Sequence, residues 1–162
     1  MYTLKFINVA WVFTFIGFLI VLSLSYASVP EQVAFHTDMQ GAPDQFIARE
    51  TFFYLALGIF VLVNIICFVF FRILRAMPAD SPIFYRSELF KDRFSAWFSS
   101  FTTVINVFLV CMVAYVSLFN TQGDYYIGQF NWIVFVGPVL FGAVILWLLV
   151  LFLSPKPVST GA

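Results

Sequence analysis

The sequence predicts an all-α membrane protein whose four transmembrane helices form two hairpins. Three observations carry this prediction: the composition, four long apolar runs and the placement of the basic residues. The chain of 162 residues is 62% hydrophobic and only 10% charged, whereas a soluble domain is usually about 45–50% apolar and about 25% charged. A soluble fold of this length could not hide so many apolar side chains from water.

Four apolar runs supply the predicted spans, and none of them contains Asp, Glu, Lys, Arg or His. Crossing the hydrocarbon layer takes about 20 helical residues at about 1.5 Å each, and each run meets that length. Because backbone polar groups in lipid must be satisfied within the segment, each run is expected to be a helix. The runs cover residues 6–27, 51–71, 94–119 and 132–153.

Residues 1–153 are thus predicted to form a single transmembrane domain, followed by a short tail, 154–162. A cleaved signal peptide is the alternative for the first run, because Ser25-Tyr26-Ala27 resembles a cleavage site. That run is longer than the usual apolar region of a signal peptide, about 7–15 residues, which favours a retained helix.

The basic residues predict the orientation. With four spans, both termini and the middle loop, 72–93, share one side, and the loops 28–50 and 120–131 lie on the other. Positive residues in short loops stay in the cytoplasm, so both termini are expected to be cytoplasmic in a bacterial plasma (inner) membrane. The first side carries Lys5, Arg72, Arg75, Arg86, Lys91, Arg93 and Lys156, and the other carries only Arg49.

The middle loop alternates aromatic and charged residues after a proline-rich break. Phe84, Tyr85, Leu89 and Phe90 interleave with charged neighbours, a pattern typical of a short amphipathic helix lying at the membrane interface. A simpler interpretation of the same pattern is that the basic residues flank the spans and extend their side chains toward the lipid headgroups.

The outer loop, 28–50, is predicted to form a compact cap over the helix ends. Val33, Phe35 and Thr37 alternate with other residues as in a short strand, and the segment 41–44 has turn chemistry. His36 and Asp44 are then expected to hydrogen-bond across the turn. A metal site that uses these two residues with Glu31 and Asp38 is the alternative, although the spacing matches no zinc signature.

This loop resembles the small membrane domain at the start of SdpI-type immunity proteins. The resemblance covers roughly residues 15–74, and its matching positions are Pro30, His36, Gly41 and Asp44, with Asp38 among the candidate cap residues. It implies that the loop lies on the outer side between the first two helices. It also implies a role like that of the named members, which protect the cell from a secreted toxin and take part in signalling.

Four polar residues inside the spans are candidates for contacts between helices, because membrane Asn often bridges neighbouring helices. Counted from the basic residues that flank the spans, Asn64 is nearly level with Thr102 and Thr103, while Asn106 lies deeper. Asn64 is therefore predicted to bond near Thr102 or Thr103 rather than to Asn106. In the last span, Gly137-Pro138 predicts a kink or a close approach, with Gly142 continuing a small-residue face.

Enzymatic and cofactor chemistry is not expected. No nucleophile, base and orienting group can be placed together, and the single His argues against a haem with two axial His ligands. Cys67 and Cys111 differ in predicted depth by roughly 20 Å, too far for a disulfide. No span contains an ionisable side chain of the kind that proton and ion carriers usually place there.

Two classes of function remain for a chain of this kind. The first is an SdpI-like membrane protein whose outer cap engages a ligand or an extracytoplasmic peptide. The second is an accessory structural subunit that packs against other membrane protein subunits. In both classes the lipid bilayer is a partner, and the zero net charge gives no reason to expect nucleic acid.

Overall fold

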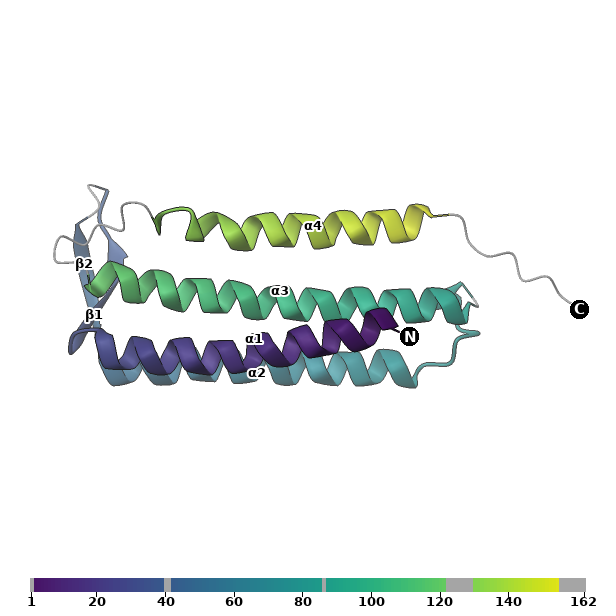
Figure 1. Cartoon of the computed structure of the whole chain (residues 1–162), viewed down its shortest axis with the longest axis horizontal. Helices are drawn as coiled ribbons and strands as arrows, with labels where there is room; N and C mark the ends of the chain where they lie inside the picture. The colour runs from purple at the N-terminus through teal and green to yellow at the C-terminus, as the bar shows by residue number, and fades with distance from the viewer. Residues whose placement is uncertain (1, 40–41, 86, 122–129, 155–162) are drawn as a thin grey trace, which may run out of the picture.

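The computed structural model describes residues 2–39, 42–85, 87–121 and 130–154. Within these residues the chain forms long helices, with a two-stranded antiparallel sheet between the first two of them (Figure 1). The sheet is an addition to the all-α prediction. The helices are α1 (Tyr2–Ser28), α2 (Arg49–Ala76), α3 (Glu88–Thr121) and α4 (Ile133–Leu153), and the strands are β1 (Gln32–Thr37) and β2 (Pro43–Ala48).

Within the described residues, four helices are long and apolar enough to cross a membrane, with mean hydropathies between 2.1 and 2.7. They are compatible with a multi-pass membrane protein whose apolar helices contact a lipid bilayer. The longest of them, α3, has 34 residues, or about 51 Å at about 1.5 Å per residue. Because the hydrocarbon layer is about 30 Å thick, the charged first turns of α3 are expected to lie outside it.

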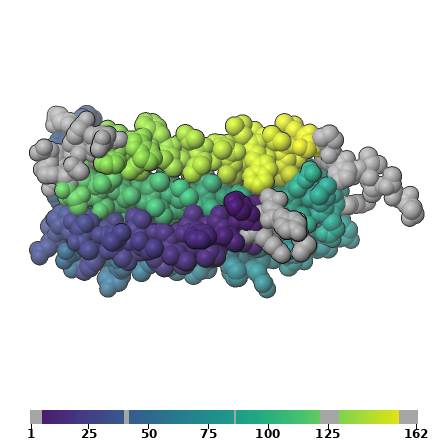
Figure 2. Space-filling view, viewed as in Figure 1, coloured from purple at the N-terminus to yellow at the C-terminus, as the bar shows by residue number. Residues whose placement is uncertain are grey.

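The bundle is centred on α3. In Figure 1, α4 lies along one side of α3, and α1 and α2 lie along the other. Helix α1 contacts α3 more extensively than it contacts α2, and α4 packs against α3. The sheet lies at one end of the bundle, and α1 begins and α4 ends at the opposite end (Figures 1 and 2).

The main core lies among α1, α2 and α3 in the half of the bundle nearest the sheet. Phe18 and Phe60 are fully buried and stack with their ring centroids 3.9 Å apart. Leu22 and Val113 complete this contact. Phe15 of α1 also lies against Phe60, with ring centroids 4.8 Å apart. Aromatic pairs at this spacing contribute about 0.5–1.5 kcal/mol beyond the area they bury, so these rings help to hold α1 against α2.

The predicted amphipathic helix in the middle loop is wrong. A short 3₁₀ helix, η1 (Pro82–Phe84), ends at Tyr85, which is in the left-handed conformation with φ 51°. Because α3 then begins at Glu88, Leu89 and Phe90 belong to its first turn. Phe84 is fully buried and clusters with Phe90 and with Leu151 of α4. Phe84 and Phe90 therefore pack inside this end of the bundle, whereas Tyr85 and Leu89 are exposed.

The predicted close approach at Gly137 is confirmed. A Cβ added at this position would overlap the ring of Phe108 on α3, so the glycine allows α3 and α4 to meet. The extension of a small-residue face to Gly142 is wrong, because no neighbouring atom lies within 4 Å of a Cβ built there. Gly142 therefore does not take part in the contact between the two helices.

Candidate functional site

The β1–β2 hairpin (residues 32–39 and 42–48) forms the predicted cap, and we call it the cap below. Val33 pairs with Ile47, and Ala34 pairs with Phe46, with irregular register between Ala34 and Thr37. The predicted short strand is thus confirmed. Val33 is completely buried and belongs to the main core cluster, whereas Phe35 is half exposed. One end of β1 therefore rests on the bundle, and its other end projects from it.

Asn120, in the last turn of α3, fastens the cap to the bundle. Its Oδ1 accepts a hydrogen bond from the backbone N–H of Ala34 at 2.7 Å, and its Nδ2 donates to the carbonyl oxygen of Ala34 at 2.9 Å. The carboxamide thus pairs with β1 as a peptide group of a neighbouring strand would. Ala34 is 1% exposed, so these bonds satisfy backbone groups that water cannot reach.

Asn120 is not among the residues for which the sequence predicted a role. The available signal is an Asn directly after an apolar run, at a position where a span ends. That signal does not reveal the bonding partner, because Ala34 lies 86 residues earlier in the chain.

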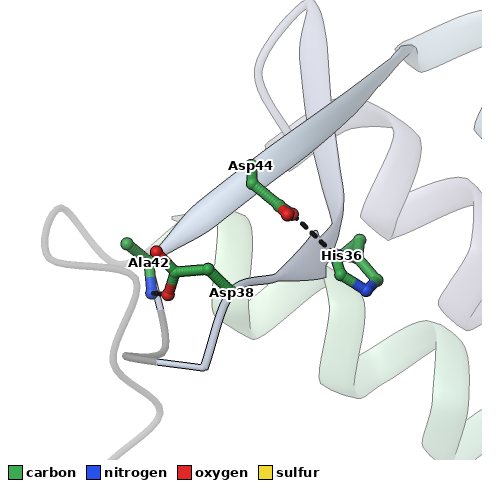
Figure 3. A network of polar contacts seen from close by, with 4 residues as sticks. All are labelled: His36, Asp38, Ala42 and Asp44. Carbon is green, nitrogen blue, oxygen red and sulfur yellow. Dashed lines mark hydrogen bonds and ion pairs between the residues drawn. The ribbon is translucent and has the colours of Figure 1, made fainter.

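His36 and Asp44 face each other across the hairpin, as Figure 3 shows. The Nδ1 atom of His36 lies 2.6 Å from Oδ1 of Asp44, so the predicted bond across the turn is confirmed. The two side chains are 55% and 40% exposed, and the described hydrogen bonds of this pair lie within the cap. The pair can order the hairpin, and it presents an imidazole and a carboxylate to the surroundings.

The other predicted cap residues have separate places. The backbone N–H of Ala42 donates to Oδ1 of Asp38 at 2.8 Å, while the Asp38 N–H donates to the Ala42 carbonyl at 2.8 Å, so Asp38 closes the turn (Figure 3). Pro30 is exposed between α1 and β1. Gly41 lies outside the described residues. Among the residues that are described, no three His, Cys, Asp or Glu side chains are grouped to hold a metal ion.

A second polar group lies inside the bundle and joins three helices. Nδ2 of Asn64 on α2 donates to Oδ1 of Asn106 on α3 at 2.9 Å, and Nδ2 of Asn106 donates to Oδ1 of Asn64 at 3.2 Å. The Nε1–H of Trp11 on α1 also donates to Oδ1 of Asn64, at 3.2 Å. Asn64 and Asn106 are buried, with 6% and 0% exposure.

The prediction that Asn64 bonds near Thr102 or Thr103 is wrong. Each Thr hydroxyl donates to a carbonyl of its own helix, that of Phe98 for Thr102 and that of Ser99 for Thr103. This is the bond that a helical Thr readily makes, and it uses the only hydroxyl hydrogen. A second carboxamide can both donate and accept, so Asn106 is the better partner for Asn64.

Comparison of the chain with protein-family models, curated proteins and solved structures gives no match.

Proposed function

We propose that this chain is a non-enzymatic membrane protein whose cap binds a peptide on the outer side of a bacterial plasma membrane. The main support is that some residues of the cap attach it to the bundle while others are exposed. Asn120 and the buried Val33 attach β1 to the bundle, while the exposed His36–Asp44 pair bonds across the hairpin. The cap thus has one side for attachment and another that is free to recognise a partner.

The charge of this end favours a peptide that carries positive charge. Glu31, Asp44 and Glu50 are exposed. The basic residue of this end, Arg49, places its guanidinium 5.0 Å from the centre of the Tyr26 ring, a cation–π contact that directs its charge toward α1. An acidic surface of this kind attracts cationic partners and repels anionic ones.

The basic residues indicate on which side of the membrane the cap lies. Arg72, Arg75, Lys91 and Arg93 lie at the end opposite the cap, and positive residues in short loops stay in the cytoplasm. The resemblance to SdpI-type immunity proteins agrees with an outer cap and suggests protection against a secreted toxin.

The His36–Asp44 pair provides the test of this function. His36→Ala and Asp44→Ala are each expected to change the stability of the purified protein by about 1 kcal/mol or less, because exposed pairs contribute little. Asp44→Ala is nevertheless expected to abolish protection of cells that face a secreted cationic peptide, because it removes an exposed carboxylate. His36→Ala is expected to weaken protection, because the Asp44 carboxylate loses the partner that orients it. The measurement is survival of a strain that lacks the chain, complemented with each variant and challenged with such peptides.

Gln45→Ala is the matched control, since Gln45 pairs with His36 in the hairpin register and is exposed. It is expected to protect as well as the unaltered chain. Full protection by the His36 and Asp44 variants, or no protection by the unaltered chain, would contradict the proposed role of the cap.

An accessory subunit is the second candidate, and the sparse burial of two helices favours it. In α1 and in α4, only 11% of the apolar membrane-spanning stretch is buried within the bundle. Large apolar residues such as Phe13 and Phe135 are exposed, and lipid or the helices of another subunit can cover them. Gentle purification at native expression separates the two: a complex of fixed stoichiometry supports the accessory role, and a lone monomer or homodimer supports the first proposal.

A further inference from the structure

We infer that the cleft between α1 and α2, near the end of the bundle opposite the cap, binds one acyl chain of an anionic phospholipid. The partly open cavity there has a volume of about 250 Å³. Residues of α1 and α2 form its sides, and α3 contributes Ser99 and Thr102. The lining includes Trp11, Val12, Cys67 and Phe68. This inference does not depend on the proposed role of the cap.

The polar groups of the lining are largely bonded to the protein itself. The Asn64 carboxamide donates to Phe60 and Asn106, and it accepts from Asn106 and Trp11. The Thr102 hydroxyl donates to its own helix. Buried water needs about two to four polar partners, and an apolar cavity of about 150 Å³ stays dry and takes up benzene. The cleft therefore suits a length of hydrocarbon chain better than water.

Basic residues at one end of the cleft favour an anionic headgroup. Along α2, Asn64, Cys67, Phe68 and Phe71 line the cleft, and Arg75 continues the same face one turn beyond Phe71. Nη1 of Arg75 donates to Oδ1 of Asp92 at 3.2 Å in an exposed pair. A guanidinium has five N–H donors, so Arg75 retains donors for a phosphate oxygen.

The dimensions agree with a single lipid. From Arg75 to Asn64 the face of α2 extends eleven residues, or about 16 Å, inward from the basic end. A lipid whose phosphate binds Arg75 would therefore place the part of an acyl chain nearest its headgroup beside Phe71, Phe68 and Cys67. Arg72, also at this end, is exposed and has no acidic partner among the described residues, which adds positive charge near the headgroup.

Protection of Cys67 from thiol modification tests this inference, because the chain has two cysteines and only Cys67 lines the cleft. The Cys111→Ala variant leaves Cys67 as the sole thiol, and Cys67→Ala leaves Cys111 as the control. Phosphatidylglycerol added to the full-length protein in detergent is expected to slow the reaction of Cys67 with a small maleimide at least about fivefold. Phosphatidylcholine is expected to slow it less, since each basic residue near an anionic headgroup is worth about fivefold in binding.

Adding Arg75→Gln to the Cys111→Ala variant is expected to remove most of the preference for phosphatidylglycerol. Native mass spectrometry provides a second readout: one phosphatidylglycerol is expected to remain bound to the unaltered chain and to be lost in Cys67→Trp, but not in Cys111→Trp. Equal reaction rates of Cys67 with and without phosphatidylglycerol, or equal slowing at Cys111, would overturn the inference. Equal retention of lipid by the two Trp variants would also overturn it.

Discussion

Replacing Asn64 with leucine is expected to lower the free energy of unfolding by about 2 kcal/mol, because Asn64 joins α1, α2 and α3. The substitution leaves Asn106, which is fully buried, without its partner, and a buried unsatisfied polar group costs about 1–3 kcal/mol. The indole N–H of Trp11 also loses its acceptor. Single interhelical hydrogen bonds in membranes contribute about 0.6 kcal/mol on average and at most about 1.7. The loss of free energy of unfolding is therefore expected to stay near about 2 kcal/mol, although more than one bond is removed.

Unfolding of the purified variants in mixed micelles measures this effect, and Thr103→Val is the matched control. The Thr103 hydroxyl donates only to its own helix, so its loss is expected to cost less than about 0.5 kcal/mol. The double variant Asn64→Leu, Asn106→Leu is expected to be less destabilised than the sum of the single variants, because removing both partners leaves neither unsatisfied. Additive costs would show that the two carboxamides do not depend on each other.

Replacing Asn120 with alanine is expected to loosen the cap while the bundle stays folded. The buried N–H and carbonyl of Ala34 both lose their partner, and we expect a cost of about 2–3 kcal/mol in the free energy that holds the cap in place. Since about 1.4 kcal/mol is a tenfold change, amide hydrogen exchange in β1 is expected to speed up by about 30-fold or more. Exchange at the centres of the helices should not change.

Thr121→Ala is the matched control, because the Thr121 hydroxyl bonds only to carbonyls of its own helix. Asn120→Asp gives a sharper comparison. Its carboxylate can accept the bond from the Ala34 N–H but cannot donate to the Ala34 carbonyl, so partial loosening is expected. Exchange in β1 that is as slow in Asn120→Ala as in the unaltered chain would show that the cap is held by Val33 and its neighbours alone.

The spans were predictable because hydropathy reports the part of a helix that lies in lipid. The first predicted span, 6–27, lies within α1, and the predicted span 132–153 differs from α4 by one residue. Helix ends were less predictable. α3 begins at Glu88, six residues before the predicted span 94–119, because charged residues can continue a helix beyond the hydrocarbon layer. The hydropathy of the run therefore did not indicate where α3 begins.

Local contacts in the candidate site were predictable, and distant ones were not. The bond between His36 and Asp44 follows from a turn that brings two nearby segments together. The bond between Asn64 and Asn106 depends on how far α3 is shifted along α2. Even with Arg75 level with its partner Asp92, eleven residues along each helix place Thr103, and not Asn106, opposite Asn64. The hydroxyls of Thr102 and Thr103 donate to their own helix, so the hydrogen-bonding capacity that each side chain has left decides which polar groups meet.

Recognition of a peptide by the cap requires that the cap lie outside the cell and the basic end inside it. In a chain that carries Cys67→Ala and Cys111→Ala, Met39→Cys places a single thiol on the fully exposed end of the cap, and Asp80→Cys places one in the segment between α2 and α3. A membrane-impermeant maleimide added to intact cells is expected to label position 39, and to label position 80 only after the membrane is permeabilised. Labelling of position 80 in intact cells, with position 39 protected, would contradict the account.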